Sequence, residues 1–161
     1  MKVLRNNQLE DCPYQQLDEG QDGSTESHVL IPLERFTRER DLWAGFGGET
    51  GVLVSGDTEP DVLLEHTDSL GLVCIHIPKF TDGRGYSLAV MLRRAGYCGT
   101  LRAVGDILFD QLDYLRRCGF DEFELKDPVR QDRYPAPEIT RHYQDIETDR
   151  AASWRRFGDN A

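Results

Sequence analysis

The residues best suited to chemistry lie in one turn, residues 81–87, whose sequence is Thr-Asp-Gly-Arg-Gly-Tyr-Ser. Two glycines flank Arg84, which lets the backbone turn tightly and approach a ligand. The helix predicted to follow presents free N–H groups at its start, so Arg84, Gly85 and Ser87 are candidates to bind a small oxyanion such as sulfite, sulfate or phosphate. Lys79 and Arg102 are candidates for additional cations at this site.

Three aspartates near the same turn allow a second interpretation. Asp82, Asp106 and Asp110 are candidates for acid–base groups, and Asp106 or Asp110 for a metal ligand. The structural alternative is that these carboxylates cap helices and interact with helix dipoles, while Arg84 pairs with Asp106 or Asp110. The chain has the spacing of neither a Walker loop nor a dinucleotide fingerprint, so we expect no cofactor.

The four cysteines, Cys12, Cys74, Cys98 and Cys118, are widely spaced and form no C-x-x-C motif. This pattern is typical of reduced, mostly buried thiols rather than of a disulfide framework or an iron–sulfur site. Cys74 and His76 share one face of a predicted strand, but two ligands are too few for zinc, so we expect no metal site. Since the sequence identifies no basic group paired with Cys98 or Cys118, we interpret neither as a nucleophile.

Short apolar runs alternate with amphipathic segments from residue 28 onward. The predicted strands are residues 29–31, 51–54, 72–77, 101–104 and 122–125. The predicted helices run over about residues 58–70, 85–95 and 106–118. This alternation predicts one α/β domain of repeated β-α units, with about five mostly parallel strands flanked by helices, as a doubly wound sheet or a partial barrel. Ligands bind beyond the carboxyl ends of such strands, where residues 81–87 fall.

The 161-residue chain divides into three parts by composition. Residues 1–27 are predicted to be an extension with a short hairpin and a linker, residues 28–130 the α/β domain, and residues 131–161 a C-terminal helix, starting near Pro137, and a polar tail. The net charge of −10 argues against a nucleic-acid or anionic-membrane surface. The apolar runs are too short to span a bilayer and we identify no signal peptide, so we expect a cytoplasmic protein, of open oligomeric state.

Several segments together resemble the bacterial family catalogued as domain of unknown function 934. They are residues 80–87, 92–93, 101–106, 110–111 and 117–121, and the resemblance covers roughly residues 70–125. Members of this family are labelled probable oxidoreductases of sulfite reduction, because they are encoded beside assimilatory sulfite reductase. The resemblance therefore implies a place in that pathway.

Three functions fit the residues and this resemblance. The first is an accessory protein of assimilatory sulfite reduction that binds sulfite reductase or a redox partner, and with it a small oxyanion; the acidic composition and the lack of cofactor motifs favour it. The second is an enzyme, an oxidoreductase acting on a small anionic sulfur substrate at the Arg84 edge, with Asp82 or Asp106 as its acid–base group. The third is a structural or regulatory subunit in which residues 82–87 only turn the chain.

Overall fold

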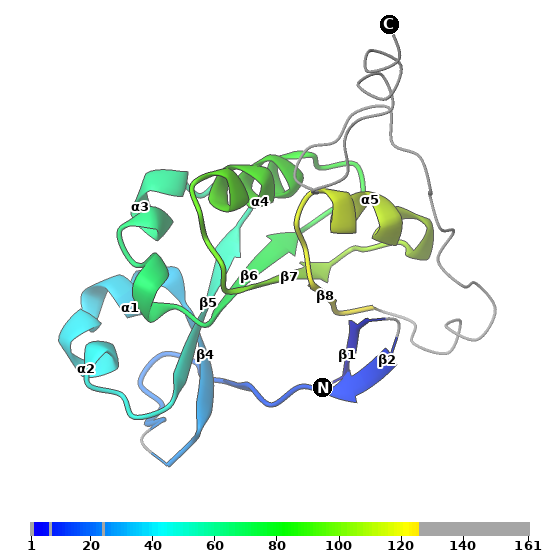
Figure 1. The fold of residues 1–161 in the computed structure, drawn as a ribbon. Coiled ribbons are helices and arrows are strands. Elements are labelled where there is room, and N and C mark those ends of the chain that lie inside the picture. Colours follow the sequence, from blue (N-terminus) through cyan, green and yellow to red (C-terminus); the bar gives the residue numbers. More distant parts are fainter. Residues whose placement is uncertain (1, 7, 24, 126–161) are drawn as a thin grey trace, which may run out of the picture.

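Eight strands form one continuous sheet in the residues that the structure, a computed structural model, describes: 2–6, 8–23 and 25–125 (Figure 1). The strands are β1 (Lys2–Arg5), β2 (Gln8–Asp11), β3 (Gln15–Gln16), β4 (His28–Pro32), β5 (Glu49–Ser55), β6 (Leu72–Ile77), β7 (Thr100–Gly105) and β8 (Glu122–Phe123). The helices are α1 (Leu33–Arg38), α2 (Arg40–Ala44), α3 (Pro60–Leu64), α4 (Arg84–Arg94) and α5 (Leu112–Arg117), with short 3-10 turns η1 (Thr67–Ser69) and η2 (Phe109–Gln111).

The five predicted strands correspond to β4 through β8, which are mutually parallel and are joined by helical connections. This confirms the α/β class. The predicted number of strands is wrong, because the N-terminal residues also join the sheet. β1 and β2 form the predicted hairpin and pair antiparallel beside β8, while β3 pairs parallel with β4 at the opposite edge. The strand order is β2-β1-β8-β7-β6-β5-β4-β3.

The sheet is curled into a half-barrel, because its two outermost strands are neighbours in the sequence. β2 ends at Asp11 and β3 begins at Gln15, although these strands lie at opposite edges. Four residue steps span at most about 14 Å, whereas a flat sheet of eight strands would be about 34 Å wide. The link through Cys12 and Tyr14 therefore holds the edges close together, and of the two predicted architectures the partial barrel is the one observed.

Alternation along the strands separates an outer core from an inner one. In β6, Ile75 packs in the outer core, beneath the helices, whereas Cys74 packs in the inner core, on the concave face. The helices lie on the outer face of the sheet (Figure 1). The inner core consists of Tyr14, Leu30, Leu72, Cys74 and Val104.

A buried ion pair lies on the concave face, between β7 and β8. Arg102 and Glu122 are register partners whose side chains are 0% exposed. Arg102 Nε donates a hydrogen bond to Glu122 Oε2 at 2.8 Å, and its Nη2 lies 2.7 Å from the same oxygen. Arg5 of β1 shares this carboxylate through an Nε–H bond of 2.7 Å to Oε1. Because an unpaired buried charge is costly, Arg102 depends on Glu122.

Two helices are predicted to start at Asp106 and near Pro137. Asp106 does not start a helix: Gly105 has a φ of 106° and Leu108 is extended, so the chain turns there before η2 and α5. The C-terminal helix predicted near Pro137, with the tail to residue 161, lies outside the described residues. None of the helices in the described ranges has the length and apolar character needed to cross a bilayer.

The ion pair gives a testable prediction about stability. Glu122→Leu should lower the free energy of unfolding by about 3–5 kcal/mol, because it leaves the Arg102 guanidinium buried without a carboxylate. The double variant Arg102→Met/Glu122→Leu should recover most of that loss, since it buries no charge at either position. Urea denaturation of the three proteins measures both effects. A double variant as unstable as Glu122→Leu would contradict this account.

Candidate functional site

The Arg84 side chain lies at the start of α4, where two carboxylates already pair with it. Asp82 Oδ1 accepts hydrogen bonds from the Arg84 backbone N–H at 3.1 Å and from Nε at 3.0 Å, and Oδ2 lies 2.7 Å from Nη2. Asp57, which follows β5, accepts from Nη1 at 3.3 Å. Arg84 thus pairs with Asp82 and Asp57, whereas the sequence predicted Asp106 or Asp110 as its partner. An anion at Arg84 would have to displace them.

The two glycines of the turn have roles other than the one expected. Gly83 has φ −79° and ψ −8°, a conformation open to any residue, so the turn does not require it to be glycine. Gly85 lies inside α4, where an added Cβ would stand 3.1 Å from Ile75 and 3.2 Å from Ile77. Its lack of a side chain therefore lets α4 pack closely on β6. Ser87 faces back along the helix and donates a hydrogen bond to the Gly83 carbonyl at 3.4 Å.

The other predicted site residues are divided between the two faces of the sheet. Lys79 is exposed, and its carbonyl accepts the Asp82 backbone N–H at 2.8 Å. Asp106 Oδ2 accepts the Phe80 backbone N–H at 3.3 Å, which ties the end of β7 to the loop before α4. Asp110 is exposed in η2. Arg102 does not reach this edge, because alternation along β7 turns it to the concave face, toward Glu122.

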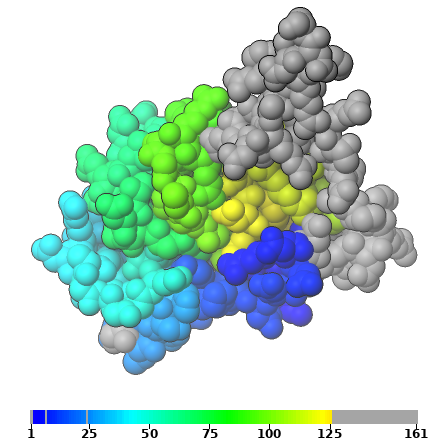
Figure 2. Space-filling model, in the orientation of Figure 1, coloured from blue at the N-terminus to red at the C-terminus, as the bar shows by residue number. Residues whose placement is uncertain are grey.

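A groove of about 670 Å³ lies beside the predicted turn, between α4 and the η2–α5 segment. These helices form neighbouring parts of one surface (Figure 2). The lining residues are Phe80, Thr81, Gly83, Tyr86, Ser87, Val90, Met91, Arg94, Gln111, Tyr114 and Cys118. Of the predicted oxyanion ligands, the groove contains only Ser87.

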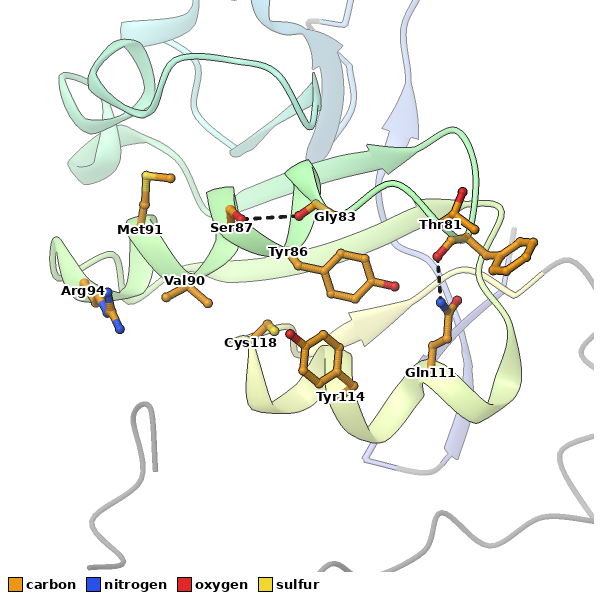
Figure 3. A pocket seen from close by; sticks show the side chains of 11 residues that line it. Thr81, Gly83, Tyr86, Ser87, Val90, Met91, Arg94, Gln111, Tyr114 and Cys118 are labelled. Carbon is orange, nitrogen blue, oxygen red and sulfur yellow. Dashed lines mark hydrogen bonds between the residues drawn. The ribbon is translucent and has the colours of Figure 1, made fainter. Parts of the chain in front are cut away.

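The middle of the groove is aromatic. Tyr86 of α4 and Tyr114 of α5 face one another with ring centroids 5.4 Å apart and an interplanar angle of 36° (Figure 3). Burial raises the pKa of Tyr86 above its ordinary value, so its phenol stays protonated at neutral pH. Gln111 closes one end by donating a hydrogen bond to the Phe80 carbonyl at 2.8 Å. Arg94 stands at the other end and is the one charged side chain among the described residues of the lining.

A family model described as "Bacterial protein of unknown function (DUF934)" matches residues 51–154. The chain belongs to the DUF934 family. The match to this family spans both helices of the groove and the Arg84 turn, whereas β1 to β4 lie outside it. No curated protein and no solved structure matches the chain.

Sequence reasoning did not identify the groove of this DUF934 protein. Three of its lining side chains are large, apolar and exposed: Phe80 (47%), Met91 (47%) and Tyr114 (54%). They come from three separate segments, so no local motif joins them. From the sequence, Tyr86 and Tyr114 are only two tyrosines in separate predicted helices. Contact between their rings depends on how far apart those helices pack.

The Arg84–Asp82 pair gives a prediction about pH. The hydrogen bond from Arg84 is the main cause that lowers the pKa of Asp82 to about 2. A carboxylate with such a pKa stabilises the fold above about pH 4, and this contribution is lost as the pH falls toward 2. Arg84→Gln should therefore return the pKa of Asp82 toward 3.8, as measured by NMR titration of the carboxyl carbons.

Asp57 is the internal control for this titration. Its pKa is lowered chiefly by a hydrogen bond from Ser55, with Arg84 a lesser cause, so Arg84→Gln should change the Asp57 titration much less. No change at Asp82 would show that the Arg84–Asp82 pair does not persist in solution, and equal changes at both carboxyls would contradict Asp82 as the main partner of Arg84.

Proposed function

We propose that this DUF934 protein is an accessory protein of assimilatory sulfite reduction that binds a partner protein in the α4–α5 groove. The pathway is the one implied by the family resemblance. The observation that carries partner binding is where apolar surface is exposed. Of six large hydrophobic side chains exposed in the described residues, Phe80, Met91 and Tyr114 line this groove, and Leu108 is in the turn that leads into η2. Gathered apolar surface of this kind is typical of interaction sites.

The lining indicates the chemistry of the segment that binds. Tyrosine, methionine and arginine are enriched in the cores of protein interfaces, and the groove supplies Tyr86, Met91, Tyr114 and Arg94. Aromatic and thioether surfaces favour an apolar or aromatic anchor. A carboxylate near that anchor would pair with Arg94, whose guanidinium is exposed at the end of the groove. We therefore expect a partner segment with an apolar anchor followed by an acidic residue.

The two alternatives at the Arg84 edge have weaker support. An oxyanion would compete with Asp57 and Asp82 for the guanidinium, and these two carboxylates would repel an anion that approaches Arg84. Catalysis there would require an acid–base group with a pKa near neutrality, but the pKa of Asp82 is lowered to about 2. The ion pairs of Arg84 with Asp57 and Asp82 are better explained as structural contacts that hold the β5–α3 loop against the start of α4.

Binding to immobilised sulfite reductase tests the proposal. The full-length chain should bind, and Met91→Asp and Tyr114→Asp should each weaken the affinity at least about tenfold, because each places a carboxylate in a desolvated contact. Leu42→Asp is the matched control, since Leu42 is 62% exposed on α2, away from the groove, and should leave the affinity unchanged. Arg94→Gln should weaken binding less and reduce its salt dependence.

Several results would overturn the proposal. Lack of binding at every ionic strength would refute this partner, and equal losses in the Leu42→Asp and Met91→Asp variants would refute this surface. A second copy of the chain in the groove would appear as a dimer that Tyr114→Asp dissociates, measured by light scattering. Protection of Tyr114 from labelling by the chain's own residues 126–161, without any partner, would likewise contradict partner binding.

A further inference from the structure

A second cluster of reactive groups lies on the concave side of the half-barrel, away from the groove. Cys12, in the link between β2 and β3, accepts a hydrogen bond from Arg102 Nη1, with Nη1 and Sγ 3.0 Å apart. The Arg102 side chain is completely buried, and Tyr14 covers it with its ring centroid 5.5 Å from the guanidinium carbon. Cys12 itself remains partly exposed. A buried cation is thus directed at the sulfur of an accessible cysteine.

Two guanidinium groups of the cluster share one buried carboxylate. Arg5 and Arg102 share the single carboxylate of Glu122. Glu10 reaches only to 4.0 Å from Arg5, where both side chains are more than two-fifths exposed, so water screens that pair. Glu124, also near the cluster, is only partly buried. Within the described residues, two guanidinium groups thus meet one fully buried carboxylate, and Nη2 of Arg102 makes no well-aligned hydrogen bond.

The remaining cysteines of the chain have different surroundings. Cys74 and Cys118 are buried, and burial raises the pKa of Cys74 to about 12, which keeps it a neutral thiol. Cys98 is exposed, but its sulfur contacts the Gly96 carbonyl, at 3.2 Å, rather than a cation. Cys12 therefore combines access to solvent with a guanidinium donor, a pairing that the other three positions do not show in the described structure.

We propose that Cys12 is a modification site that undergoes exchange with small anionic disulfides. The Cys12 sulfur attacks one sulfur of the disulfide, forming a new S–S bond while the original S–S bond breaks. The second half of the reagent leaves as a thiolate, and the Cys12 thiol proton passes to solvent. Arg102 stabilises the negative charge on the attacking sulfur through its N–H bond, and Arg5 with Arg102 attracts the anionic reagent.

Dithiobis(nitrobenzoate), an anionic disulfide, is a suitable probe on the full-length chain. Cys98→Ser reports the reaction of Cys12, and Cys12→Ser reports that of Cys98, through the absorbance of the released thiolate. Cys12 should react at least about fivefold faster than Cys98, although it is the less exposed of the two. This ratio should shrink with dithiodipyridine, an uncharged disulfide. A Cys12 rate at or below that of Cys98 would overturn the proposal.

Two variants made in the Cys98→Ser background test the role of the guanidinium. Arg102→Met/Glu122→Leu removes the donor with its counterion and should slow Cys12 at least about fivefold, whereas Glu122→Gln removes only the carboxylate and should accelerate it. Buried Cys74 and Cys118 report folding, because mass spectrometry should find them unmodified in each variant. Unchanged Cys12 rates in both variants, with Cys74 and Cys118 protected, would refute the role of Arg102.

Discussion

The short link between β2 and β3 is the constraint on which the rest of the structure depends. Three residues join opposite edges of an eight-stranded sheet, so the sheet cannot be flat. Curling gives it a concave face too narrow for helices, and the crossing chain fills that face with Cys12 and Tyr14. The helices are therefore confined to the convex face. A right-handed β-α repeat alone does not impose this division, because it also permits helices on both faces.

The helices on the convex face leave a groove because they differ in length and in how they begin. α4 starts directly after its loop and runs for 11 residues, packed closely on β6 by Gly85. The chain after β7 instead turns at Gly105 and passes through η2, so α5 has only six residues. Leu112 and Leu115 anchor α5 in the core, which leaves Tyr114 to face Tyr86 across the gap. Aromatic surface is thus exposed between two helices of unequal length.

The sequence was sufficient to predict the β-α repeat, the five central strands, the N-terminal hairpin and α4, because each depends on local periodicity or on a nearby turn. It was not sufficient for the strand count or the curl, which depend on where residues 2–16 join the sheet. Arg102 shows the same limit. It is predicted as an additional cation at the Arg84 site, but a charged residue inside an apolar strand requires a buried partner. Glu122, at the start of the next predicted strand, was the signal for that partner.

The two sites proposed for this chain use opposite faces of the same strands. β8 shows the separation most simply, since Glu122 turns inward to Arg102 while Phe123 packs outward, with the Arg116 guanidinium 5.3 Å from its ring centroid. The groove is lined by helix and loop residues on the outer face, whereas the Cys12 cluster lies on the concave face. None of the groove-lining residues belongs to that cluster in the described structure. The family match covers the groove-lining residues and, in the Cys12 cluster, Arg102 and Glu122, but it excludes Cys12 itself. The partner-binding site and the thiol-exchange site are therefore physically separate. Variants of the groove can be used to measure Cys12 reactivity, and variants of Cys12 to measure partner binding.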